Sequence, residues 1–292
     1  MGIPTVIDNE TTLKNIASIV YFCCKGWVRN MARKNYILFL AILVIPCLMF
    51  ALIWRRLGTA GAPPATPISH AREIPIPAAP RVDRRNYNAV RTRIENERVK
   101  LWSRYHQATG INQRATIISE ARHLLIRAIY EDIVPYWYGT EWDFYGTTET
   151  PGQGKIACGY FVTTVLRDAG MKVQRVGLAQ QASENILLSL TTNDHIKRFR
   201  RVPIGDFVEA VRSWGDGLYV VGLDNHVGFI LSIASEVYFV HSSYAEPYCV
   251  VIERSIESRV LASSQYRVLG KLSEDDALIG KWLNGDAFVT KS

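Results

Sequence analysis

An uncharged stretch near the N-terminus constrains this chain more than any other feature of its sequence. From Tyr36 to Trp54 the sequence reads YILFLAILVIPCLMFALIW, 19 residues without a charged side chain. A helix of that length crosses the hydrocarbon core of a bilayer, and the aromatic rings at its two ends favour the membrane interfaces. A helix buried in a soluble protein rarely stays apolar on every face for so long. The sequence therefore predicts one transmembrane helix over residues 36–54.

The segments on either side of this helix favour one orientation. Four basic residues precede it closely and three follow it, namely Lys25, Arg29, Arg33 and Lys34 before and Arg55, Arg56 and Arg72 after. That excess favours a cytoplasmic tail over residues 1–35. Residues 55–83 are rich in Pro and Ala, which predicts an extended linker that holds a folded domain away from the membrane. Met31 is an alternative start, which would leave a shorter signal-anchor.

The rest of the chain, residues 84–292, has the pattern of an α+β domain. Apolar residues at three- and four-residue intervals predict a hairpin of two helices, over 87–106 and from Asn112 to Ile129. Further helices are expected over 158–169, 183–190, 206–214 and 276–282. Short β-branched and aromatic segments predict strands over 218–223, 226–233, 237–242, 249–256 and 266–272. Helices followed by an antiparallel sheet define the α+β class.

Charge and motifs exclude several classes of function. The formal net charge is +7, and ten Lys or Arg against three Glu fall between Arg84 and Arg127. Such an excess suits either an anionic headgroup or wall polymer, or simply a pair of solvated helix faces. No phosphate-binding loop, zinc-ligand cluster or nucleic-acid motif accompanies it. We therefore expect no cofactor, no metal and no nucleic-acid partner.

Cys158 is the candidate nucleophile. It stands at the start of a strongly amphipathic predicted helix, where free backbone N–H groups and the helix dipole favour a thiolate. Gly159 keeps the space beside the sulfur open, and the backbone N–H of Cys158 is a candidate oxyanion donor. The alternative is structural, because Cys249 is the other cysteine of the soluble part and a disulfide would join the two.

Two histidines supply candidates for a base and for the residue that orients it. His226 opens an apolar strand, HVGFIL, and His241 lies in the next strand, YFVHSS. A two-residue turn that contains Ala234 would put both rings on one face of the hairpin, directly opposite or offset by two positions. His226 would then take the proton of Cys158, and His241 would fix the tautomer of His226. A three-residue turn would put the rings on opposite faces.

These segments resemble a known family. The helix that begins at Cys158 (ACGYFVTTVLRDAGM) and the two histidine strands (NHVGFIL and YFVHSS) resemble the NlpC-type cysteine peptidases, papain-fold enzymes of bacterial cell-wall metabolism. The resemblance implies a papain-like fold with Cys158 as nucleophile, His226 as base and His241 as orienting residue. It also implies γ-D-glutamyl amide bonds of peptidoglycan stem peptides as substrates. The family has Asp before and Ser after the cysteine; Ala157 and Gly159 stand there in this chain, which bears on the substrate preference.

An aromatic, glycine-containing loop precedes the cysteine in that family, and PYWYGTEWDFYGT stands in the same place here. We expect this loop to line the substrate groove through Tyr138, Trp142 and Tyr145, with the two tyrosines as alternatives for the family's tyrosine. Gln153 is a candidate oxyanion donor by analogy with papain. Gly159 completes the expected substrate-binding set.

The sequence thus predicts a single-pass protein of the inner (cytoplasmic) membrane, with a papain-like cysteine hydrolase domain over 84–292 in the periplasm or outside the cell. The expected partner is a peptide or a peptidoglycan fragment, cleaved at an amide bond through an acyl-enzyme. One alternative keeps the fold but replaces water by an amine, as in an acyltransferase or a transglutaminase-like enzyme. Another is a non-catalytic domain that binds a wall component or a partner.

Overall fold

The computed structural model describes residues 83–291. The predicted cytoplasmic tail, the transmembrane helix and all of the linker before Asp83 therefore lie outside the described residues. Within 83–291, no helix has both the length and the apolar composition that a membrane span requires.

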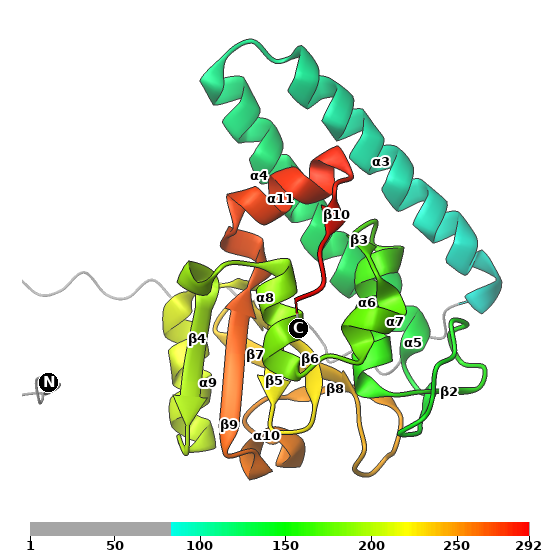
Figure 1. The fold of residues 1–292 in the computed structure, drawn as a ribbon, viewed down its shortest axis with the longest axis vertical. Helices are drawn as coiled ribbons and strands as arrows, with labels where there is room; N and C mark the ends of the chain where they lie inside the picture. Colours follow the sequence, from blue (N-terminus) through cyan, green and yellow to red (C-terminus); the bar gives the residue numbers. More distant parts are fainter. Residues whose placement is uncertain (1–82, 292) are drawn as a thin grey trace, which may run out of the picture. The chain divides into compact units, whose positions relative to one another are not determined.

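A helical hairpin begins the described part of the chain (Figure 1). Its two long helices match the predicted pair closely at both ends. Gly110, and not Asn112, caps the second helix, and the side-chain oxygen of Gln113 accepts a hydrogen bond from the Gly110 N–H at 3.5 Å. The elements are η2 (Arg84–Asn86), α3 (Tyr87–Gln107), α4 (Ile111–Arg127), the π-helical turn η3 (Ala128–Ile133) and α5 (Val134–Trp137).

The basic residues of this hairpin are largely paired with acidic groups. Five ion pairs involve Arg93 with Asp132, Arg98 with Glu95, Arg104 with Glu120, Arg122 with Asp276 and Arg127 with Glu97. Surface pairs of this kind add little stability, but they use the charges that an anionic polymer would otherwise contact. The basic stretch is therefore better explained as ion-paired helix faces than as a binding surface.

A six-stranded antiparallel sheet follows, which confirms the predicted α+β class. The predicted strands all form, in the spatial order β4-β9-β5-β6-β7-β8. The edge strand β4 was not predicted, because three of its five side chains are charged and exposed and it lacks an apolar pattern. The strands are β4 (Ile196–Arg200), β5 (Gly217–Leu223), β6 (Val227–Ile233), β7 (Glu236–Ser242), β8 (Val250–Arg254) and β9 (Tyr266–Lys271).

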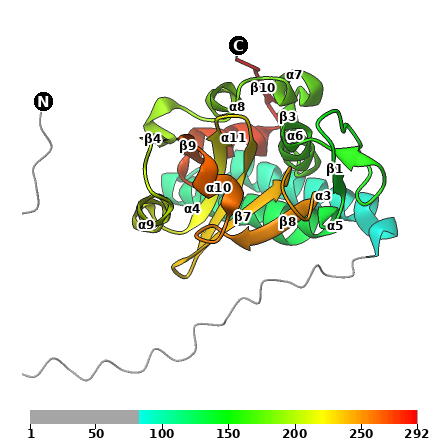
Figure 2. The same cartoon turned by 90° about the horizontal axis from the view of Figure 1, so that it is seen from below.

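Helices cover both faces of this sheet (Figures 1 and 2). In β5, Leu218 and Val220 enter the larger of two cores while Tyr219 and Val221 enter the smaller, as the two-residue period of a strand requires. The larger core is completed by α3, α4, α5, α6 (Cys158–Asp168), α8 (Ser183–Leu190) and α11 (Asp276–Asn284), and the smaller by α9 (Ile204–Trp214) and α10 (Arg259–Ser263).

Short elements connect these layers. Two small parallel pairs join β1 (Glu141–Trp142) to β2 (Lys155–Ile156) and β3 (Lys172–Val173) to β10 (Ala287–Phe288). The remaining helical turns are α7 (Arg175–Ala179), η4 (Asn193–His195) and η5 (Leu272–Glu274). β1 and β2 fix the aromatic loop in front of α6, and α7 packs directly against α6. β2 therefore leads directly into the N-terminal end of α6, and β3 follows its C-terminal end.

Candidate active site

Cys158 is the first residue of α6, as the sequence predicts. Ala157 caps the helix in an extended conformation, so the first-turn N–H groups of α6 point toward its N-terminal end. Burial raises the pKa of the Cys158 thiol, while backbone N–H groups of Val227, Gly159 and Cys158 itself act in the opposite direction. The net shift is upward, so the free protein holds a neutral thiol at neutral pH. Formation of a thiolate at Cys158 would therefore require a base close by.

Gly159 is required by a close approach between two helices. A Cβ atom at this position would lie 2.3 Å from the carbonyl oxygen of Ala179, at the end of α7. No side chain fits into that gap, because the obstructing atom belongs to the backbone. The expectation that Gly159 leaves this space open is therefore wrong, because the Ala179 carbonyl occupies it. The same contact excludes the serine that the resembled family has after its cysteine.

The two histidines meet as the hairpin argument predicts. Ile233 pairs with Glu236, so the turn consists of Ala234 and Ser235, both with left-handed backbone angles (φ 51° and 68°). This register offsets the two rings by two positions and keeps them on one face. Nε2 of His226 lies 2.9 Å from Nδ1 of His241.

Glu253 extends this pair into a chain of three side chains, and the sequence analysis did not find it. Nε2 of His241 lies 3.2 Å from Oε1 of Glu253, which stands on β8 opposite Phe239 and diagonal to His241. Burial raises the pKa of Glu253, but hydrogen bonds from His241 and Ser258 outweigh that effect and lower it overall. Glu253 is therefore an anion near neutral pH.

The chain of hydrogen bonds determines where each imidazole proton lies. An ionised carboxylate only accepts, so His241 donates its Nε2–H to Glu253 and its Nδ1 is a bare lone pair. That lone pair accepts the Nε2–H of His226. The Nδ1 of His226 is consequently the unprotonated nitrogen, and it is the atom that can accept a proton from a thiol.

Aromatic rings pack against the two histidines, and burial keeps both imidazoles neutral. The ring of Phe239 stacks on His241 with centroids 4.0 Å apart, and the ring of Tyr244 lies edge-on to His226 at 5.1 Å. Burial lowers the pKa of His226 well below 6.5, and the neighbouring His241 lowers it further. Burial also lowers the pKa of His241, against the opposing effect of Glu253. Both imidazoles are thus neutral at neutral pH.

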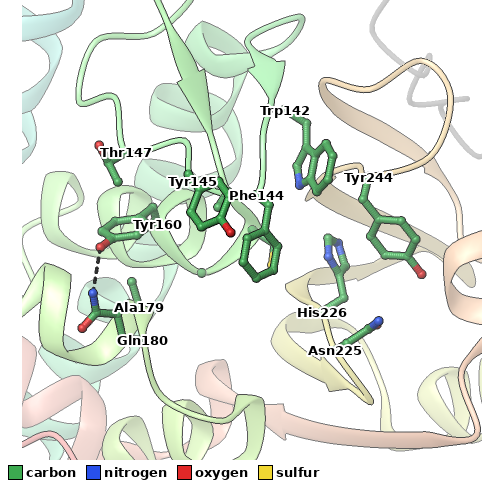
Figure 3. A pocket seen from close by; sticks show the side chains of 13 residues that line it. Trp142, Phe144, Tyr145, Thr147, Tyr160, Ala179, Gln180, Asn225, His226 and Tyr244 are labelled. Carbon is green, nitrogen blue, oxygen red and sulfur yellow. Dashed lines mark hydrogen bonds between the residues drawn. The ribbon is translucent and has the colours of Figure 1, made fainter.

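Cys158 and His226 line the same cavity, of about 630 Å³. Figure 3 shows this cavity from close by. The N–H of Val227, the residue that follows His226, also lowers the pKa of the Cys158 thiol. Five of the eleven other lining residues are aromatic, and Figure 3 shows the Trp142 and Tyr244 rings beside His226. The eleven residues are Trp142, Phe144, Tyr145, Thr147, Ala157, Gly159, Tyr160, Ala179, Gln180, Asn225 and Tyr244.

The predicted substrate-binding residues divide into two groups. Trp142, Tyr145 and Gly159 line the cavity. Tyr138 is buried in the main core and Gln153 lies in a turn where its N–H bonds Thr150, and neither is among the residues that line it. Of the two tyrosines expected from the loop, Tyr145 is therefore the one that lines the cavity, and the candidate oxyanion donors that remain are the N–H groups at the start of α6.

The alternative of a disulfide between the two cysteines is wrong. Cys158 and Cys249 are both free thiols. Among the residues from 83 to 291, no group of three or more His, Cys, Asp or Glu side chains is arranged to hold a metal ion. The arrangement at Cys158 is thus a thiol, a neutral imidazole and an anion behind it.

Comparison with known proteins returned no match to any family model, to any curated protein or to any solved structure. The interpretation of the site therefore depends on its own geometry.

Proposed function

We propose that this chain is a cysteine amide hydrolase with a papain-like domain, which cleaves its substrate through an acyl-enzyme. Cys158 is the nucleophile, His226 the general base and acid, and His241 the residue that orients His226. Glu253 anchors His241 and stabilises the positive charge that develops on the two rings.

The hydrogen-bonded series Glu253–His241–His226 is the observation that carries this proposal. It leaves a lone pair on Nδ1 of a neutral imidazole that shares a cavity with a thiol at a helix N-terminus. A nucleophile, a base within the same cavity and a group that orients the base together define the arrangement of nucleophilic acyl transfer. Each of these features alone also occurs in structural sites.

The reaction has two steps, acylation of Cys158 and hydrolysis of the thioester. Nδ1 of His226 takes the proton of Cys158 as the sulfur attacks the amide carbonyl, and the N–H groups at the start of α6 stabilise the oxyanion. The imidazolium of His226 then protonates the leaving amine, which departs and leaves a thioester. Water attacks the thioester while His226 accepts its proton, and the carboxylic acid and the free thiol are released.

Two parts of the proposal depend on the sequence alone. The apolar run 36–54 anchors the domain to the inner membrane, and the domain acts in the periplasm or outside the cell. Peptidoglycan stem peptides are the substrates that the resemblance to NlpC-type enzymes implies. The replacement of the family's Asp and Ser by Ala157 and Gly159 indicates that the preferred peptide differs from the family's usual one.

The chemistry can be tested without knowing the natural substrate. p-Nitrophenyl acetate transfers its acetyl group to a competent thiol and releases a coloured phenolate. We expect the full-length protein in mild detergent to give a burst followed by turnover, with the acetyl group found at Cys158 by peptide mass spectrometry.

The variants separate the roles. Cys158→Ala should abolish the burst, and His226→Ala should slow both acylation and deacylation, whereas Cys249→Ala should behave as wild type. Acetylation of Cys249 as fast as that of Cys158, or a burst that survives Cys158→Ala, would overturn the proposal.

A further inference from the structure

Cys158 lies where two cavities meet. The second cavity, of about 570 Å³, shares Cys158 and His226 with the first, together with Gly159, Ala179 and Asn225. The close contact between Gly159 and the Ala179 carbonyl lies at this junction. A substrate whose carbonyl is at the sulfur therefore has room to extend into both cavities.

The first cavity is uncharged and aromatic. Its lining contains no Asp, Glu, Lys or Arg side chain, and burial keeps His226 neutral. Phe144 and Tyr145 are 71% and 84% exposed although their rings pack edge to face at 5.0 Å. Covering such exposed rings with an apolar surface removes them from water and lowers the free energy of the complex. This side suits an uncharged substrate group with an apolar face.

The second cavity is charged, and its charges are not equally available. The carboxylate of Glu184 is held by Arg198 and by the hydroxyl of Tyr266, and the carboxylate of Asp224 accepts hydrogen bonds from Ser264 and the N–H of Gln265. Both anions already have donors from the protein. They therefore leave little capacity to bind a cation from the substrate.

Arg200 is the charged group of this cavity that remains available. Its Cζ atom lies 4.5 Å from the centroid of the Tyr266 ring, and its charge acts on Glu184 in the same cavity without a direct ion pair. None of the ion pairs among residues 83–291 involves Arg200. A planar, stacked guanidinium with free donors is suited to a carboxylate.

We infer, on the basis of the proposed function, that the substrate carries a carboxylate on one side of the scissile carbonyl and an uncharged group with an apolar face on the other. Arg200 binds the carboxylate, and Phe144 and Tyr145 cover the apolar face. The substrate class is thus an amide that is polar and anionic at one end and apolar at the other. Asn225, which lines both cavities, is placed to contact the substrate between these two ends.

Four thiol-alkylating probes test this in a two-by-two design. They are N-ethyl-2-iodopropanamide with neither group, N-ethyl-2-iodo-3-phenylpropanamide with the ring alone, N-(2-iodopropanoyl)glycine with the carboxylate alone, and N-(2-iodo-3-phenylpropanoyl)glycine with the two groups on opposite sides of the reacting carbon. In each case the sulfur displaces iodide and forms a thioether. The second-order rate constant at Cys158 is measured by peptide mass spectrometry on the full-length protein, with Cys249 as the reference thiol.

We expect the carboxylate and the ring each to raise the rate at Cys158 relative to Cys249 by about tenfold, which corresponds to about 1.4 kcal/mol. Arg200→Ala should remove the preference for the carboxylate alone, and Arg200→Lys should retain part of it. Phe144→Ala should weaken only the preference for the ring. Both side chains are exposed, so these variants retain the fold.

Matched controls remove the same chemical group elsewhere. Arg212→Ala removes an exposed guanidinium from α9, and Trp102→Ala removes an exposed ring from α3, and both should leave the preferences unchanged. Equal rates for all four probes, or an identical effect of Arg200→Ala and Arg212→Ala, would overturn the inference even if the acetyl-enzyme forms. Clear preferences in a protein that forms no acetyl-enzyme would support the binding assignment and overturn the hydrolase proposal instead.

Discussion

Replacement of Glu253 by Gln tests the role of the anion behind the histidine pair. The amide oxygen of Gln can still accept the Nε2–H of His241, so Glu253→Gln removes the charge and keeps an acceptor. The charge acts on His226 across about 8 Å, since hydrogen bonds of 3.2 and 2.9 Å and one imidazole ring lie between. At an effective dielectric constant of about 20 this amounts to about 2 kcal/mol.

The partial exposure of Glu253 to water reduces this interaction energy. The Glu253 side chain is 33% exposed, so water screens part of its field and about 1 kcal/mol is a better expectation. This corresponds to about 0.7 pH unit in the pKa of His226 and to about fivefold in a rate that depends on a developing imidazolium. Because a negative charge favours the imidazolium, its removal lowers the pKa of His226 further. The acid limb of the pH–rate profile should therefore move to lower pH.

The assay is the pH dependence of p-nitrophenyl acetate turnover by the full-length protein. Glu253→Gln should lower the plateau by about fivefold and move the acid limb down by about 0.7 pH unit. Glu253→Ala, which also removes the acceptor, should lose more rate. Glu257→Gln removes an exposed carboxylate that pairs with Arg254 and should change neither quantity. If Glu253→Gln lowers only thermal stability and leaves the acid limb in place, Glu253 has a packing role and the relay is refuted.

Three further predictions follow from the same residues. The pKa values of His226 and His241 are lower in the folded protein than in the unfolded chain, so stability is lost as pH falls below about 6.5. Between pH 7 and 5.5 the free energy of unfolding, measured by thermal unfolding, should fall by about 1–2 kcal/mol. His226→Asn should make this fall smaller. Gly159→Ala would place a Cβ 2.3 Å from the Ala179 carbonyl and should cost about 1–3 kcal/mol of stability along with activity, whereas Gly205→Ala, which meets nothing within 4 Å, should be neutral. Gly228→Ala would place a Cβ 2.9 Å from the Cβ of His241 and should displace that side chain. The acetylation burst should then fall even in the protein that remains folded, which is checked by normalising the burst amplitude to the amount of folded protein.

The histidine pair was predictable because the length of a short turn determines which residues of the two strands pair. Once the turn contains two residues, the parity of every position in the next strand is determined, and the structure selects the pairing with Ala234 and Ser235 in the turn. Glu253 lies beyond a longer connection between β7 and β8 that includes Tyr248 in a left-handed conformation (φ 56°). Parity cannot be counted across such a segment, so the third side chain of the relay could not be identified from spacing.

The aromatic loop marks the limit of sequence reasoning in a different way. A loop has no period, so the sequence indicates that its rings are important without indicating which of them face the cavity. Tyr138 directs its ring into the main core, whereas Tyr145, seven positions later, is exposed at the site. Tyr244 and Arg200 were missed for a related reason. Arg200 ends β4 and Tyr244 lies just after β7, and both are far from Cys158 in the sequence. Only the folding of the sheet brings them to the two cavities beside Cys158.

The neutral state of the site constrains how the enzyme would work. With the pKa of Cys158 raised and that of His226 lowered, a resting thiolate–imidazolium pair is disfavoured in the free protein. In the proposed reaction, the N–H groups at the start of α6 would stabilise the charge that develops on the sulfur side, and Glu253 would stabilise the charge on the imidazole side. Both groups are held in place before substrate arrives, so they need no reorganisation during the reaction. A buried neutral thiol also reacts slowly with stray electrophiles, and a substrate that fills the cavities on both sides of Cys158 gains selectivity from binding rather than from the reactivity of the sulfur.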